Sequence, residues 1–310
     1  FSTDHLENAS LYIATLLPPH GSTGVQTHIH AACELARTAG MKVDVVSPYA
    51  ITKAVRGPLR RLANVLACCN AEYGAVLDRH ILYLLVEHKL KAAINSAHAK
   101  TIIYAQDLLS ARAALKIKQI RPSAQIILIV HFNISESWEF VLKGIAREGC
   151  QVAHYLAAVE KSVLPRVDRL IFVSEFMKKT VLARVPEAAK LPIWIVPNIV
   201  RAPRLQDSID SSGDLVTIGT IEPRKNQAFL LRVLAETHRC GHPYRLTIIG
   251  DGEDEWRLKQ LVHELALDNY VTCLGYVPDA ADLISAHKVY VHAAVMEGFV
   301  PAEYGKSLTD

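Results

Sequence analysis

Apolar residues occur in short unbroken runs, and each run is followed by a longer stretch in which they recur at helical spacing. The runs at 11–17, 101–105 and 126–130 contain almost only apolar and β-branched residues, which is typical of buried parallel strands. Stretches such as 25–36 place apolar residues three and four positions apart, as one face of a helix requires. This alternation predicts an α/β protein built from βαβ units.

One polar segment divides this series in two. Residues 201–214 are polar and rich in turn-forming residues, and the alternation resumes at Leu215. We therefore predict two Rossmann-like parallel-sheet domains, 1–200 and 215–310, joined by the linker 201–214 and facing each other across a cleft. The chain begins with Phe1 and stops soon after a strand-like run, so we expect a fragment whose second domain is incomplete.

Charge and cysteine content argue against several classes of protein. The sequence has 34 Lys and Arg against 31 Asp and Glu, and a net charge of +3 is too small to indicate a nucleic-acid partner. Its 6 cysteines form no C-x-x-C pair and no Cys/His pattern of structural zinc, which favours a reducing cytoplasm. No apolar run approaches the roughly 18 residues that a membrane span needs, and the start of the chain resembles no signal peptide. We expect a cytoplasmic protein.

A basic segment in the first half leaves two interpretations open. Residues 49–98 look helical, and Lys53, Arg56, Arg60 and Arg61 stand there among apolar residues. One interpretation is peripheral contact with the anionic inner face of the cell membrane. The other is a solvated helix whose apolar side faces the protein's own core.

The loop after the first strand contains two glycines, Gly21 and Gly24. Glycine lets the backbone approach a ligand, and the free N–H groups of the helix that follows favour an anion. The loop is not a G-x-G-x-x-G motif, and no acidic residue ends the second strand, which argues against a dinucleotide site.

Histidines stand out at two places in the first domain. His131 directly follows the run 126–130, so it is expected at the crevice side of the sheet, either as a functional group or bonded to a neighbouring loop. His28 and His30 are two apart on a predicted helix and project in different directions, so they are not expected to share a metal ion.

The second domain opens with two adjacent cations. Arg224 and Lys225 lie in the turn between the strand-like run 215–218 and the next helix, where open α/β sheets bind ligands. Arginine offers a planar fork for phosphate oxygens and lysine a compact charge, so the pair predicts a diphosphate clamp. A solvated loop is the alternative.

These stretches, in this order and spacing, resemble the GT-B glycosyltransferases, and within them family 4, also called glycosyl transferases group 1. The resemblance runs from about residue 11 to 299 and is strongest from 215 onward. Its carriers are Gly-Thr-Ile-Glu-Pro-Arg-Lys-Asn at 219–226, Leu-Thr-Ile-Ile-Gly-Asp-Gly at 246–252, Val-Thr-Cys-Leu-Gly-Tyr-Val at 271–277 and Glu-Gly-Phe at 297–299.

The resemblance implies a donor site for a nucleoside-diphosphate sugar. Arg224 and Lys225 would hold the diphosphate and stabilise its developing charge, so that neither a metal ion nor another cofactor is expected. Gly219 and Gly250 would belong to the same donor site, and Gly21 and Gly24 would form the loop near the diphosphate and the acceptor.

The sugar end of the donor would meet residues from both domains. The resemblance implies that His131 and Glu297 contact the sugar, with the backbone of Gly298 and Phe299 beneath it. It implies a retaining hexosyltransferase, in which the departing phosphate assists the acceptor hydroxyl. The acceptor would be a glycan or a lipid-linked molecule, in polysaccharide biosynthesis.

The sequence departs from the family pattern at several positions. Thr220 stands where many relatives have arginine, and Ala294 replaces a common serine. The family's second glutamate, eight residues after the first, falls here on Gly305, so Glu303 is expected to be a displaced ribose-binding carboxylate. The family also continues beyond this point with further βα units, which implies a C-terminal truncation and a weakly active or inactive chain.

Rival functions share this architecture. A sugar-nucleotide epimerase is the nearest, because a fold does not determine the chemistry. A truncated, non-catalytic nucleotide-binding fragment is the second. A dinucleotide oxidoreductase is the weakest, since neither first-strand loop carries its fingerprint.

Overall fold

The computed structural model describes residues 9–19, 21, 24–95, 100–132, 134–142, 146–197 and 213–295. The chain divides into two compact units, unit 1 at 1–199 and unit 2 at 200–310, each with its own parallel sheet. The predicted linker 201–214 is too long at its end, because Gly213 and Asp214 already belong to the first strand of unit 2.

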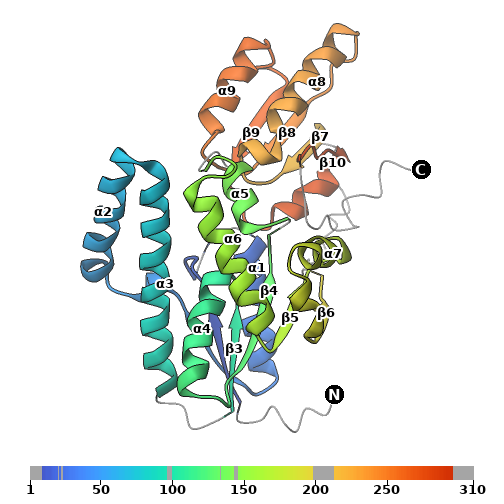
Figure 1. The fold of residues 1–310 in the computed structure, drawn as a ribbon. Helices are drawn as coiled ribbons and strands as arrows, with labels where there is room; N and C mark the ends of the chain where they lie inside the picture. Colours follow the sequence, from blue (N-terminus) through green and yellow to red (C-terminus); the bar gives the residue numbers. More distant parts are fainter. Residues whose placement is uncertain are drawn as a thin grey trace. The chain divides into compact units, whose positions relative to one another are not determined.

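Unit 1 contains a six-stranded parallel sheet in the order β2-β1-β3-β4-β5-β6 (Figure 1). Its strands are β1 (Ser10–Ala14), β2 (Lys42–Val46), β3 (Thr101–Ala105), β4 (Gln125–Val130), β5 (Arg169–Phe172) and β6 (Ile193–Ile195). The chain leaves β1 toward β2 and then crosses to β3 on the other side of β1. This reversal is the topological switch point at which doubly wound sheets bind ligands.

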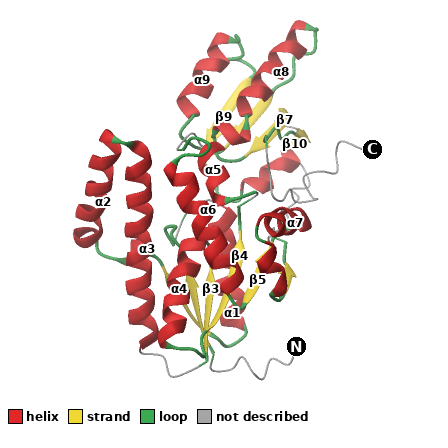
Figure 2. Cartoon of the chain, in the orientation of Figure 1, coloured by secondary structure: helices red, strands yellow, loops and turns green. Residues whose placement is uncertain are grey.

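Helices cover the sheet of unit 1, and α3, α4 and α6 lie side by side over one face (Figure 2). The helices are α1 (Gly24–Thr38), α2 (Lys53–Cys69), α3 (Ala71–Asn95), α4 (Leu108–Ile120), α5 (Glu136–Leu142), α6 (Gln151–Val163) and α7 (Glu175–Arg184), with short 3-10 turns at Pro48–Ala50, Leu164–Arg166 and Pro186–Lys190. The faces that meet the sheet are apolar, which is the pattern that the helical spacing predicted.

The helical stretch predicted at 49–98 is an antiparallel pair, α2 and α3 (Figure 1). Asn70 separates the two helices with an extended backbone at φ −152°. Its side-chain oxygen accepts the N–H groups of Glu72 and Tyr73 at 3.1 Å each, which satisfies the first donors of α3.

Unit 2 contains a four-stranded parallel sheet in the order β10-β7-β8-β9. Its elements are β7 (Gly213–Ile218), the 3-10 turn η5 (Pro223–Lys225), α8 (Gln227–Arg239), β8 (Leu246–Ile249), α9 (Glu255–Glu264), β9 (Val271–Gly275), the 3-10 helix η6 (Ala280–Ala286) and β10 (His287–Tyr290). Leucines of α8 and α9 pack on β8 to form the core of this unit.

The last described strand begins two residues before the predicted run at 289–293. The ring of His287 accounts for this shift, because its Nε2 lies 2.8 Å from Thr247 Oγ1 of β8 and its Nδ1 lies 2.9 Å from the carbonyl oxygen of Leu283. These contacts place His287 beside Gly213 as the first paired residue of β10. Within the described ranges, no helix is long and apolar enough to span a bilayer.

Candidate functional site

The strands of unit 2 end in loops that continue the parallel hydrogen-bond ladder. Gly219, directly after β7, donates its N–H to the carbonyl oxygen of Ile249 at 2.9 Å. Gly250, directly after β8, donates in the same way to Gly275 at 2.8 Å. The carboxyl edge of this sheet is therefore held in register beyond the strands themselves.

Two of the predicted donor-site glycines allow these loops to approach each other. A Cβ atom on Gly250 would lie 2.1 Å from the carbonyl oxygen of Gly219, and Gly250 has a positive φ of 140°. No side chain fits at this distance, because the neighbour is backbone and cannot move aside. Packing of the loops thus accounts for glycine at position 250, a reason that the sequence did not indicate.

The two cations lie in the turn that the sequence predicted, between β7 and α8. Arg224 and Lys225 occupy η5, and Asn226 then adopts a left-handed conformation, with φ 56°, before α8 begins. The buried side chain of Gln227 donates from Nε2 to the carbonyl oxygen of Thr220 at 3.0 Å, which ties the helix start to the loop. The stem of Lys225 runs over Gly219, whose Cβ would lie 3.8 Å from Lys225 Cδ and Cε.

An acidic neighbour, which the sequence did not reveal, accompanies the cations. Arg224 Nη2 donates to Glu222 Oε1 at 2.6 Å, and the two side chains are only 17% and 13% exposed. Glu222 therefore orients the guanidinium and offsets part of the turn's positive charge. Such a pair between residues two apart in a turn has no periodic signature in a sequence.

The second group of candidate residues lies at the carboxyl edge of the sheet in unit 1. His131 follows β4, and its Nε2 lies 3.1 Å from Oε1 of Gln106, which follows β3. The ring of His28, from α1, meets the ring of His131 edge-on, with 5.3 Å between centroids. His28 Nε2 also lies 2.8 Å from the hydroxyl of Tyr104. The sequence indicated His131, but it considered His28 only as a metal ligand.

This histidine pair is uncharged at neutral pH. Burial lowers the pKa of His131 to about 3, and the neighbouring His28 adds to the effect. Burial also lowers the pKa of His28. Because Gln106 Oε1 is an acceptor, His131 Nε2 carries the ring proton, and Nδ1 is the acceptor atom.

Two buried polar atoms beside His131 have no hydrogen-bond partner among the described residues, namely Nδ1 of His28 and Nε2 of Gln106. The two side chains are only 7% and 3% exposed. A buried polar atom without a partner costs about 1–3 kcal/mol, so such atoms gather where a ligand or an ordered water supplies the bond. This edge of unit 1 is built to receive a polar molecule.

The remaining glycines of the prediction lie around the start of α1. Gly24 is the first residue of this helix. Gly21 packs against Gln26, whose Nε2 donates to the carbonyl oxygen of Pro18 at 2.9 Å. Residues 20, 22 and 23 of this loop lie outside the described residues.

Some predicted site residues cannot be placed. Glu297, Gly298, Phe299 and Glu303 all lie outside the described residues. Of the positions that depart from the family pattern, Thr220 is exposed in the loop after β7. No cluster of three or more His, Cys, Asp or Glu residues in the described part of the chain is arranged to hold a metal ion.

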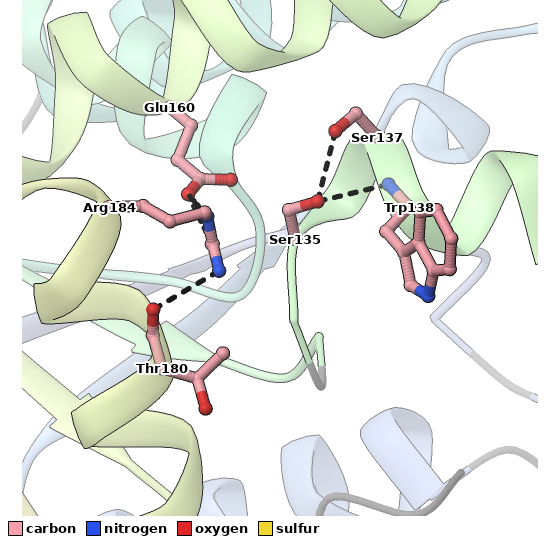
Figure 3. A network of polar contacts seen from close by, with 6 residues as sticks. All are labelled: Ser135, Ser137, Trp138, Glu160, Thr180 and Arg184. Atoms are coloured by element: carbon pink, nitrogen blue, oxygen red, sulfur yellow. Dashed lines mark hydrogen bonds and ion pairs between the residues drawn. The ribbon is translucent and has the colours of Figure 1, made fainter. Parts of the chain in front are cut away.

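Buried carboxylates lie behind the histidine pair. Glu160 of α6 accepts from Arg184 of α7, whose Nη1 also donates to the carbonyl oxygen of Thr180 at 3.2 Å (Figure 3). Ser135 begins α5 by accepting the N–H of Trp138 at 3.0 Å (Figure 3). Glu136 follows it, and burial raises the pKa of Glu136 to about 7.

Comparison with protein families decides the identity of the chain. The family described as Glycosyltransferase Family 4 matches residues 22–202, which is more than half of the sequence. The chain belongs to glycosyltransferase family 4. Residues 206–301 match a second description, Glycosyl transferases group 1, so the glycosyltransferase assignment covers both units.

Solved glycosyltransferases of low sequence identity share the fold. The Anabaena protein HepE, solved with UDP-glucose, is similar over 94% of this chain and 76% of its own, with a TM-score of 0.61 and 13% identity. The lipopolysaccharide outer core galactosyltransferase WaaB is similar over 95% of this chain and 76% of its own, with a TM-score of 0.56 and 16% identity. These likenesses confirm the predicted GT-B fold.

Other relatives are considerably longer than this glycosyltransferase chain. An uncharacterised glycosyltransferase of Methanocaldococcus jannaschii is 25% identical over 195 residues, which are 59% of this chain and 46% of the relative. Staphylococcus aureus TarM is similar over 70% of this chain and 41% of its own, with a TM-score of 0.54 and 16% identity. The chain thus spans less than half the length of these two proteins.

Proposed function

We propose that this protein transfers a hexosyl residue from a nucleoside-diphosphate sugar to a hydroxyl of a glycan or lipid-linked acceptor, with retention of configuration. The observation that supports it most is the turn of Arg224 and Lys225 at the carboxyl end of β7, held in place by Glu222 and Gln227. Solved relatives were obtained with UDP or UDP-glucose, which supports a nucleotide donor.

The two cations bind the diphosphate of the donor in this proposal. When the bond between the anomeric carbon and the phosphate oxygen breaks, negative charge grows on the leaving diphosphate. Arg224 and Lys225 stabilise this charge more strongly than that of the ground state, which is how binding accelerates a reaction. We propose that they do so without a metal ion or another cofactor.

His131 contacts the transferred sugar. Its neutral ring offers Nδ1 as an acceptor to a sugar hydroxyl, while Nε2 is directed to Gln106. The acceptor oxygen forms the new bond to the anomeric carbon on the face that the phosphate leaves. The proton of the acceptor hydroxyl passes to the departing phosphate oxygen, so no base from the protein is required.

Binding of nucleoside diphosphates tests the first part of this proposal. Titration calorimetry with UDP, GDP and ADP should give saturable binding of at least one of them to the 310-residue chain. Arg224→Ala and Lys225→Ala should each weaken it by about tenfold or more, because each removes a charge-assisted contact. Arg239→Ala is the matched control, since Arg239 is 76% exposed at the far end of α8. No binding of any of the three would overturn the proposal.

Acceptor-dependent release of nucleoside diphosphate tests the second part. A transferase releases the nucleotide only when an acceptor is present, whereas an epimerase converts the donor sugar without one. Product analysis should show the anomeric configuration of the donor retained. Conversion of the sugar nucleotide in the absence of acceptor would contradict the proposed transfer.

A further inference from the structure

Helix α2 places its small side chains against the protein and its large apolar side chains toward solvent. It packs on α3, and Figure 1 shows it on the side of α3 away from the sheet. Ala63 is 1% exposed, and Ala67 lies so close to Gly74 of α3 that a Cβ on this glycine would lie 2.4 Å from the Ala67 Cβ. Small residues thus form the contact between the two helices.

The opposite face of α2 is apolar and open. We call it the α2 face; it consists of Leu59, Leu62, Val65 and Leu66, which are 40%, 59%, 64% and 36% exposed. These positions are spaced three and four residues apart, so they form one continuous stripe. An amphipathic helix of a globular protein normally turns this stripe to its core. A contiguous exposed apolar stripe of this kind marks an interaction surface.

The charge around the stripe identifies the partner. Between Val45 and Ala71 the chain contains four cations, Lys53, Arg56, Arg60 and Arg61, and no acidic residue. Arg61 is exposed beside the stripe. Arg56 stacks on the uncharged ring of Tyr49, with Cζ 4.3 Å from the centroid, and so keeps its charge. Arg60 is paired with Asp78 of α3 at 2.7 Å.

We propose that the α2 face docks on the surface of an anionic lipid bilayer. Its leucines and valine enter the boundary between headgroups and acyl chains, and the flanking cations meet the anionic headgroups. A second copy of the chain fits less well, because a two-fold contact between α2 helices would bring two sets of cations together without an acidic residue on the helix to pair with them. The alternative of the basic segment, an apolar side facing the core, disagrees with the exposure of these four side chains.

Vesicle binding of the intact chain tests this proposal. Co-sedimentation with vesicles of 30% phosphatidylglycerol in phosphatidylcholine should show binding, which weakens with added salt and on pure phosphatidylcholine vesicles. The double variant Leu62→Ser, Val65→Ser should lower the partition coefficient by about tenfold or more, because it removes two apolar side chains from the contact. Arg61→Gln should lower it by about fivefold.

A matched control separates this face from general hydrophobicity. Leu35 of α1 and Ile120 of α4 are 61% and 62% exposed, as open as the residues of the stripe. The double variant Leu35→Ser, Ile120→Ser should bind vesicles like the unchanged chain, and circular dichroism should show that both double variants are folded. Equal binding by the two double variants, or no binding of the unchanged chain to anionic vesicles, would overturn the proposal. So would a dimer that the change at Leu62 and Val65 dissociates, in a chain that ignores vesicles.

Discussion

Arg224 and Glu222 form a half-buried ion pair inside the loop that carries the proposed diphosphate site, with Nη2 and Oε1 2.6 Å apart. The carboxylate therefore has two opposing effects on a bound phosphate. It holds the guanidinium in one orientation, which favours binding. It also places a negative charge close to the phosphate, which opposes binding.

Two substitutions of Glu222 separate these effects. In Glu222→Gln the amide oxygen still accepts from Arg224 while the charge is gone, so affinity for a nucleoside diphosphate should rise about two- to fivefold. In Glu222→Ala the orientation is lost as well, and affinity should fall below that of the Gln variant. Calorimetric titration with UDP and GDP measures both. Weaker binding in Glu222→Gln than in the unchanged chain would instead mean that the carboxylate contacts the nucleotide directly.

Gly250→Ala should disrupt the carboxyl edge of the sheet in unit 2. The new Cβ would lie 2.1 Å from the Gly219 carbonyl oxygen, so the two loops would have to separate. We expect unit 2 to lose about 2 kcal/mol or more, and nucleoside diphosphate binding to weaken with it. Hydrogen–deuterium exchange of peptides from β7 and β8 measures the loss of protection.

Gly241→Ala is the control for Gly250→Ala. Gly241 also has a positive φ, 87°, but a Cβ there meets no atom within 4 Å. Its cost is therefore the backbone strain alone, about 1 kcal/mol, with no effect on nucleotide binding. Similar protection and similar binding in the two variants would show that the approach of the loops does not matter.

His131 should remain neutral from pH 8 down to about pH 4, because its pKa is lowered to about 3. Nitrogen-15 chemical shifts of the ring should show Nε2 protonated and Nδ1 unprotonated, with no transition near the ordinary value of about 6.5. The unfolded chain takes up this proton and the folded chain does not, so stability should fall as the pH drops below 6.5. A transition of His131 between pH 6 and 7 would contradict the neutral pair with His28.

Much of the fold followed from periodicity, whereas partners of single residues did not. The run 126–130 predicted a buried strand and therefore the place of His131 at its carboxyl end, which the structure has. The partners His28 and Gln106 come from a helix and a loop that are distant in sequence, so no local pattern connects them. Contacts of this kind depend on how elements pack, which a single sequence does not reveal.

The α2 face shows a different reason for a missed feature. Helical spacing determines which residues share a side of a helix, but not which side packs against the protein. The sequence left both sides of α2 open, and packing turned on the small size of Ala63 and Ala67, which lets α3 approach closely. Likewise, the close contact of Gly250 with Gly219 depends on two loops whose spacing only the assembled sheet defines.

Glu136 should make unit 1 less stable as the pH rises. Its side chain is buried, and Oε2 has no hydrogen-bond partner within the described part of the chain. Burial raises its pKa from 4.5 to about 7, with Arg79 opposing this rise and the charges of Asp107, Glu139 and Glu160 adding to it. The folded chain thus holds a proton that the unfolded chain releases between these two values. The stabilisation is complete below pH 4.5 and is lost as the pH rises through 7.

The variant Glu136→Gln removes this dependence, because the amide stays neutral at every pH. Relative to the unchanged chain, it should gain on the order of 3 kcal/mol between pH 4.5 and pH 8, since one pKa unit corresponds to about 1.4 kcal/mol. Urea unfolding in a Trp256→Phe background follows unit 1 alone, where Trp138 and Trp194 remain. Glu187→Gln, at an exposed position of the same unit, should leave the pH dependence as it is. The same slope in both variants would mean that Glu136 is already ionised at neutral pH, with Arg79 compensating for its burial.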